Sequence, residues 1–231
     1  MDNHRILEFL TALRENNSLT WMAANKKFHK DAEAQFIELV QTLIMRLAES
    51  DKSIAHLTAK DLIFRLNRDT RFSHDKSPYN PSFRAHISPG GRVPIPAGYY
   101  INVAPRNIFL GGGLFATQFP DATATVRDYI VDKGNELQDI LETPKFSAHY
   151  SLMGEKLKNV PRGYPVDHPQ AEYLKHKSWD VEYHLDDTVF ENVDGFVDLA
   201  VKQFILMQPF NGFFNKALSG YKMPERKPKE R

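Results

Sequence analysis

Apolar residues recur at helical spacing at both ends of the chain. The first stripe predicts a helix over residues 3–15 and consists of Ile6, Leu7, Leu10 and Leu13. A second stripe predicts one long helix that begins with Thr20 as its N-cap and carries Phe36 and Leu43 on its apolar face. Helical spacing returns over residues 121–141, interrupted at Gly134, and over residues 193–207, with Pro209 expected to interrupt the last helix.

The period of the pattern shortens in the middle of the chain. Alternating or compact apolar segments predict strands over residues 62–68, 82–88, 99–103, 107–110 and 178–185. Short turns between most of them favour antiparallel pairing over crossover connections. We therefore expect an α+β fold, in which the helix containing Phe36 and Leu43 covers a central antiparallel sheet. Residues 1–220 are expected to form one domain and residues 221–231 a mobile basic tail.

The composition narrows the classes of protein that remain. The 231 residues are 42% hydrophobic and 26% charged, which is typical of a globular protein. The absence of cysteine excludes disulfides, zinc–cysteine sites, iron–sulfur clusters and cysteine nucleophiles. No apolar run suggests a membrane span and no signal segment is recognisable, so we expect a cytoplasmic protein.

Positive charge is concentrated in one part of the chain. The whole sequence has 30 Lys and Arg against 29 Asp and Glu. Between residues 65 and 120, however, the basic residues outnumber two acidic ones, Asp69 and Asp75; they are Arg65, Arg68, Arg71, Lys76, Arg84, Arg92 and Arg106. An arginine-rich sheet between acidic helices is a candidate anion site. The alternative is that these arginines pair with carboxylates elsewhere in the fold.

The densest group of candidate functional residues lies within residues 65–79. Arginine and lysine there suit a phosphate or carboxylate, and the two aspartates could orient them. The predicted ligand-binding residues are Arg65, Arg68, Asp69, Arg71, Asp75, Lys76 and Tyr79. If a proton is transferred, the candidates are His74, Lys76 and Tyr79.

This stretch resembles an uncharacterised family of bacteria and fungi that is classed as a domain of unknown function. The family signature reads Arg-x-x-Arg-Asp-x-Arg-Phe followed after a short gap by Lys-x-x-Tyr, which this chain matches from Arg65 to Tyr79. Further matching segments include Asn16-Asn17, Gly111 to Leu114, Arg127 with Ile130, and Pro161 to Tyr164. The resemblance implies an α+β fold and implies no reaction, because the family has no established one.

Other patterns leave two alternative functions open. Six aromatic residues interleave with the arginines: Tyr79, Phe83, Tyr99, Tyr100, Phe109 and Phe115. Aromatic residues beside arginine on a sheet can bind single-stranded nucleic acid. A structural Arg/Asp network in a protein-interaction scaffold is the other. The nine histidines show no metal-ligand spacing, so no metal is expected. The sequence indicates no particular cofactor, and the leading prediction is a small anionic ligand.

Overall fold

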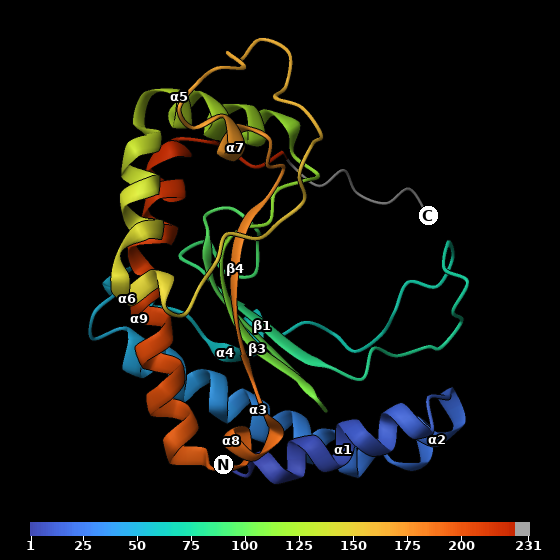
Figure 1. The fold of residues 1–231 in the computed structure, drawn as a ribbon. Coiled ribbons are helices and arrows are strands. Elements are labelled where there is room, and N and C mark those ends of the chain that lie inside the picture. Colours follow the sequence, from blue (N-terminus) through green and yellow to red (C-terminus); the bar gives the residue numbers. More distant parts are fainter. Residues whose placement is uncertain (225–231) are drawn as a thin grey trace.

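The computed structural model describes residues 1–224, and its elements alternate between helical and sheet regions (Figure 1). The helical segments before the sheet are α1 (Asn3–Glu15), α2 (Leu19–Ala24), α3 (Lys26–Leu47), the 3-10 turn η1 (Lys52–Ile54) and α4 (Ala59–Leu62). The strands are β1 (Phe83–Ile87), β2 (Gly98–Ala104), β3 (Asn107–Leu114) and β4 (Trp179–Leu185). The remaining helices are α5 (Pro120–Glu142), α6 (Pro144–Ser147), α7 (Ala171–Leu174), α8 (Asp187–Glu191) and α9 (Val193–Ala217).

The four strands form one antiparallel sheet in the order β1-β2-β3-β4. This confirms the predicted α+β fold and the antiparallel sheet. The predicted tail is described only in part: residues 221–224 have no regular structure, and residues 225–231 lie outside the described residues.

The predicted strand over residues 62–68 is wrong. This segment begins in α4 and continues as an irregular chain that meets the sheet only through an isolated bridge between Ile63 and Ala85. The Phe64 amide donates to the Arg84 carbonyl at 2.9 Å. A short apolar run does not distinguish a strand from a loop that buries Leu66 and Ile63, and here the loop forms.

The predicted second helix is also divided. Ser18 caps α2 by accepting a hydrogen bond from the Trp21 amide at 3.2 Å, and Asn25 separates α2 from α3. The Asn25 side chain donates to the Trp21 carbonyl at 2.9 Å. Asparagine side chains compete in this way with backbone hydrogen bonds of a helix, which explains the break.

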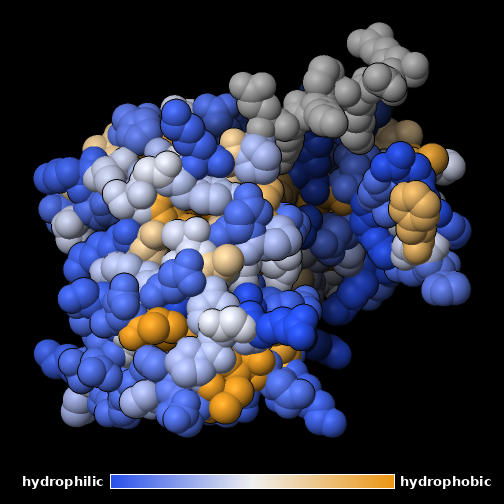
Figure 2. Space-filling model, turned by 90° about the horizontal axis from the view of Figure 1, so that it is seen from above, coloured by the Kyte–Doolittle hydropathy of each residue, from blue (hydrophilic) through white to orange (hydrophobic). Residues whose placement is uncertain are grey.

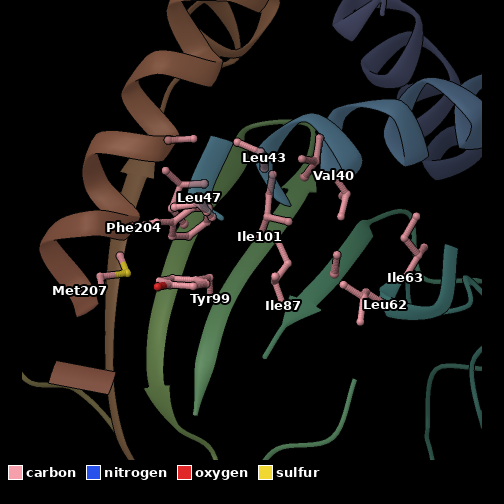
Figure 3. Packing of buried hydrophobic residues seen from close by; sticks show 14 of the residues in the cluster. Val40, Leu43, Leu47, Leu62, Ile63, Ile87, Tyr99, Ile101, Phe204 and Met207 are labelled. Atoms are coloured by element: carbon pink, nitrogen blue, oxygen red, sulfur yellow. The ribbon is translucent and has the colours of Figure 1, made fainter. Parts of the chain in front are cut away.

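One face of the sheet packs on α3 and α9 and forms the core (Figure 3). The ring of Phe36 on α3 stacks on Phe83 with centroids 5.3 Å apart, as expected for the helix that covers the sheet. From α9, Phe204 contacts Tyr99 with ring centroids 5.2 Å apart. Burial of these rings is the main stabilising contribution that holds both helices to the sheet.

Two predicted helix breaks do not occur. Helix α5 continues through Gly134, and α9 continues through Pro209. In α9 the buried side chains of Phe204, Met207 and Phe210 flank the proline on the sheet side. Their packing offsets the backbone hydrogen bond that proline cannot make, which costs about 3 kcal/mol in a helix interior.

Glycine allows α9 to lie close to the sheet. A Cβ atom on Gly112 would come within 2.9 Å of the Met207 sulfur and 3.1 Å of the Asn211 side chain. Asn211 accepts a hydrogen bond from the Gly113 amide at 2.7 Å and donates to the Gly98 carbonyl at 3.1 Å. Within the glycine run at residues 111–113, Gly112 therefore serves the close packing of α9 on the sheet.

Candidate functional site

The signature residues lie on a long hairpin at residues 63–81, which we call the signature hairpin. The Arg68 amide donates to the Pro78 carbonyl at 2.9 Å, and the Asn80 amide donates to the Leu66 carbonyl at 2.7 Å. These bonds close the base of the hairpin and leave residues 69–77 as its tip. Figure 1 shows the hairpin extending away from the sheet, and Figure 2 shows a hollow between it and the body of the molecule.

The cations at the tip are engaged within the hairpin itself. Arg68 forms an ion pair with Asp75, and the Arg71 Nε donates to Asp69 at 2.9 Å. The Lys76 ammonium donates to the Thr70 carbonyl at 2.9 Å. Hydrogen bonds from Ser77 and the nearby guanidinium of Arg68 lower the pKa of Asp75 well below its usual range.

The other signature residues lie apart from these pairs. Tyr79 is buried, and its backbone pairs with the Asn17 side chain. His74 is exposed at the tip, and Phe72 is 95% exposed. Arg65 lines a cavity of about 350 Å³ at the base of the hairpin, together with Lys60, Asp61 and Arg92. That any of the signature residues binds a ligand stays a prediction.

The open face of the sheet carries a second set of chemically active side chains. In an antiparallel sheet, residues directly opposite one another share a face. One row across the four strands consists of Arg84, Asn102, Phe109 and His184. The next row consists of His86, Tyr100, Gly111 and Glu182. The open face is thus polar and aromatic, in contrast to the core face.

Two neighbouring cavities cover these rows and share Tyr100; we call them together the sheet-face groove. The aromatic cavity, about 480 Å³, has as its main lining residues Phe64, Arg92, Tyr100, Phe109, Phe115 and Glu182. The polar cavity, about 300 Å³, has among its lining residues Arg14, Ser82, Arg84, Tyr100, Asn102 and Asn107. These volumes are in the range of small-ligand sites.

Aromatic rings define the first cavity. The centroid of Tyr100 lies 6.2 Å from Phe64, 5.9 Å from Phe109 and 6.3 Å from Phe115. The guanidinium carbons of Arg84 and Arg92 lie 5.4 and 5.5 Å from the centroid of Phe64. Both distances are within the range of cation–π attraction, which helps to hold the two arginines beside the cavity.

Three arginines line the groove, and each can be checked for a carboxylate partner in the described part of the chain. Within residues 1–224, no ion pair includes Arg14, Arg84 or Arg92. Arg14 donates to the Pro105 carbonyl at 3.3 Å, and Arg92 donates to the Ile63 carbonyl. The Arg84 Nε is buried and without a hydrogen-bond partner among the described residues. The groove therefore combines three positive charges with one carboxylate, that of Glu182.

Burial changes the protonation of groups on and beside the open face. It raises the pKa of Tyr100, an effect that the nearby Arg84 partly offsets. Burial lowers the pKa of His86 to about 4, so this side chain is neutral at pH 7. Burial also raises the pKa of Asp180, next to Glu182 on the same face of β4, to about 6.

The side chain of Asn102 in the polar cavity is held by two neighbours. The Ser82 hydroxyl donates to the Asn102 side-chain oxygen at 2.6 Å, and the Asn102 amide donates to the Asn107 carbonyl at 2.7 Å. An amide fixed in this way keeps one orientation, which is what selective recognition of a ligand requires.

Part of the groove comes from segments that the sequence singles out. Arg84 and Arg92 belong to the charge surplus of residues 65–120, and Tyr100, Phe109 and Phe115 are among the aromatic residues interleaved with arginine. Arg14, Phe64 and Glu182 were missed, because they come from segments that approach one another only in the folded chain. The alternation Arg84, His86 on β1 and Tyr100, Asn102 on β2 was the available signal for a polar face.

Across residues 1–224, no helix combines the length and the apolar character needed to cross a membrane. The same residues contain no group of three or more His, Asp or Glu side chains arranged to hold a metal ion.

Comparison with known proteins identifies one family. The model of the family described as "Conserved hypothetical protein (DUF2461)" matches residues 5–213 of this chain. No curated protein and no solved structure matches this chain. The match confirms the expectation of an uncharacterised conserved domain.

Proposed function

The chain belongs to the DUF2461 family of conserved hypothetical proteins, and because that description names no activity, we propose a function from the geometry: the sheet-face groove binds a small ligand that carries a phosphate or carboxylate group. The observation that carries the proposal is the set of three arginines around the groove, Arg14, Arg84 and Arg92, without a carboxylate partner among the described residues.

An anion would complete the hydrogen bonding of these arginines. A guanidinium presents five donors in a planar fork, which matches phosphate and carboxylate oxygens. Arg84 offers a buried Nε–H that lacks a partner among the described residues. A buried donor without an acceptor costs free energy, and a ligand oxygen would remove that cost.

The arginines are also positioned before a ligand arrives. Backbone carbonyls accept from Arg14 and Arg92, and Phe64 lies beside the guanidinium groups of Arg84 and Arg92. Side chains that are already ordered lose less conformational entropy on binding, which increases affinity.

In this proposal the signature hairpin is a structural element and does not bind the ligand. Arg68, Arg71 and Lys76 are engaged with Asp75, Asp69 and a backbone carbonyl inside the hairpin. Among the predicted binding residues, Arg65 lies next to the groove. It lines the cavity at the base of the hairpin together with Arg92, and Arg92 also lines the aromatic cavity. The candidates for proton transfer, His74, Lys76 and Tyr79, line neither cavity of the groove.

The test is a calorimetric titration of the protein with inorganic pyrophosphate and, separately, with citrate. We expect saturable binding of at least one probe and an affinity about 10- to 100-fold weaker in Arg84→Gln, which corresponds to the loss of a charged hydrogen bond. The matched control is Arg162→Gln, which removes the same charge from an exposed position outside the groove and should bind like wild type. Absence of binding of both probes to wild type, or equal weakening in both variants, contradicts the proposal.

A further inference from the structure

The two cavities of the groove differ in chemistry, and this difference constrains the ligand. Among residues 1–224, the charged residues that line the polar cavity are Arg14 and Arg84, and no carboxylate lines it. The aromatic cavity is lined by phenyl and phenol rings and by Arg92 and Glu182. A ligand that occupies both must carry an anion at one end and a flat, largely apolar group at the other.

We infer that the ligand of the groove is a free nucleotide, with its phosphate beside Arg14 and Arg84 and its base in the aromatic cavity; this inference rests on the proposed function. Every nucleobase has a π-face that stacks on aromatic side chains, and its phosphate provides the anion. Tyr100 lines both cavities, so a ligand that passes from one to the other crosses its ring.

One position in the middle of the open face carries no side chain. Gly111 lies between Tyr100 on β2 and Glu182 on β4 in the same row of the open face. An added Cβ there would approach no heavy atom closer than 3.4 Å. That Cβ would lie in ordinary van der Waals contact with Tyr100 and Phe109, two residues that line the aromatic cavity, so a larger side chain at position 111 would extend beside their rings.

Glu182 sets the orientation of the ligand. Its Oε2 lies 2.9 Å from the Nε2 of His184, and its carboxylate repels a phosphate but can accept hydrogen bonds from the N–H groups on the edge of a base. It lies on β4, whereas Arg84 lies on β1, and three strand spacings separate these strands by about 14 Å. Because Arg92 also lines the aromatic cavity, the orientation rests on Glu182, which is the carboxylate among the lining residues of the groove, and on Arg14 and Arg84, which line the polar cavity.

The source of the nucleotide could be a free molecule or a single strand of nucleic acid. Three arginines are few for a strand, which is usually held by a longer basic surface and binds with a steep dependence on salt. The net charge of the whole chain is only +1. These observations favour the free nucleotide.

The test compares ligands that add one chemical feature at a time. The probes are inorganic phosphate, ribose 5-phosphate, 1-naphthyl phosphate, AMP and GMP, with an octanucleotide as a separate arm. For wild type we expect naphthyl phosphate to bind about tenfold more tightly than ribose 5-phosphate, because of stacking, and at least one of AMP and GMP more tightly still.

Variants assign each feature to a residue. Gly111→Val should weaken binding of AMP, GMP and naphthyl phosphate about tenfold and leave ribose 5-phosphate unchanged. The control is Gly212→Val on α9, where an added Cβ meets nothing within 4 Å. It should leave the affinity for every probe unchanged. If Gly111→Val does not fold, Phe109→Leu provides the same comparison without added volume. Glu182→Gln should alter the affinities for AMP and GMP but not for naphthyl phosphate.

The outcomes separate this inference from the proposed function. If ribose 5-phosphate binds as tightly as AMP and GMP, the inference of a nucleotide is wrong, whereas the proposed binding of an anion in the groove is supported. If no anion binds, the proposed function fails and the inference fails with it. If the octanucleotide binds more than 100-fold more tightly than either mononucleotide, with a steep salt dependence, a nucleic-acid strand replaces the free nucleotide.

Discussion

Asn17 pairs with the backbone of Tyr79 through both ends of its side-chain amide. The Asn17 Nδ2 donates to the Tyr79 carbonyl at 2.9 Å, and the Tyr79 amide donates to the Asn17 Oδ1 at 3.1 Å. The asparagine lies between α1 and α2, and the tyrosine lies near the end of the signature hairpin. The pair therefore fixes the base of the hairpin to the N-terminal helices.

Replacement of Asn17 should loosen this attachment. In Asn17→Ala both backbone groups of Tyr79 lose their partner, and we expect the free energy of unfolding to fall by about 1–3 kcal/mol. Urea denaturation measures this change, and hydrogen exchange at the amides of Arg68 and Asn80 should accelerate. Asn16→Ala is the control, since that side chain bonds only within its own helix. A loss as large in the control would mean that the pair has no special role.

Removal of Arg68 should have a small effect on stability. Its side chain is 29% exposed, and that of its partner Asp75 is 57% exposed. Ion pairs with this degree of exposure contribute about 0–1 kcal/mol. We expect Arg68→Ala to shift the urea midpoint slightly and to leave pyrophosphate binding unchanged. Loss of pyrophosphate binding would instead assign the anion site to the signature hairpin.

His86 should make stability depend on pH in the acid range. The folded protein holds this histidine neutral down to about pH 4, whereas the unfolded chain protonates it near 6.5. Between these values the unfolded state binds more protons, so the free energy of unfolding falls as the pH is lowered. His86→Gln removes this contribution. Between pH 7 and pH 4.5 the free energy of unfolding of wild type should therefore fall by about 2–3 kcal/mol more than that of the variant.

The measurement for His86 is urea denaturation of both proteins at the two pH values without ligand. Comparison with the variant cancels the contributions of His176 and Asp180, which also have shifted pKa values. Equal losses in the two proteins would show that His86 becomes protonated in the folded state as readily as in the unfolded chain.

Gly134 should resist the substitution that usually stabilises a helix. Alanine in place of glycine normally adds about 1 kcal/mol to helix stability. At Gly134 the added Cβ would lie 2.5 Å from the Gln170 side chain, which is buried and bonded to Asn135 and Gln138. We expect Gly134→Ala to lose about 1–3 kcal/mol in urea denaturation. Gly212→Ala, with open space around the new atom, should gain stability; an equal gain at Gly134 would contradict the close contact.

The elements that follow a clear period were predictable from the sequence. The alternation in residues 82–88 and 178–185 identified β1 and β4, and the apolar stripe of α3 identified the helix that covers the sheet. The predicted helix breaks at Gly134 and Pro209 are wrong, because the effect of glycine or proline on a helix depends on the side chains that pack beside it. The predicted strand at residues 62–68 is wrong because a short apolar run is compatible with a strand and with a buried loop.

The candidate site could be predicted only in part, for a different reason. The sequence has a surplus of arginine between residues 65 and 120, and two residues of this segment, Arg84 and Arg92, line the cavities of the groove. The charge of Arg68 and Arg71 is compensated by neighbours in sequence, Asp75 and Asp69, whereas Arg84 has no such neighbour. Which arginines remain unpaired depends on the tertiary structure, which also brings Arg14 of α1 to the edge of the sheet.

The most direct test of the account follows the arginine Nε–H signals by NMR while pyrophosphate is added to ¹⁵N-labelled protein. The groove proposal predicts a saturable change in the signal of Arg84, whose Nε is buried and without a partner among the described residues, and unchanged signals of Arg68 and Arg71. Assignment uses the Arg→Gln variant of each residue. A saturable change confined to Arg68 and Arg71, or no change at any arginine, would contradict the proposal that the sheet-face groove is the anion site.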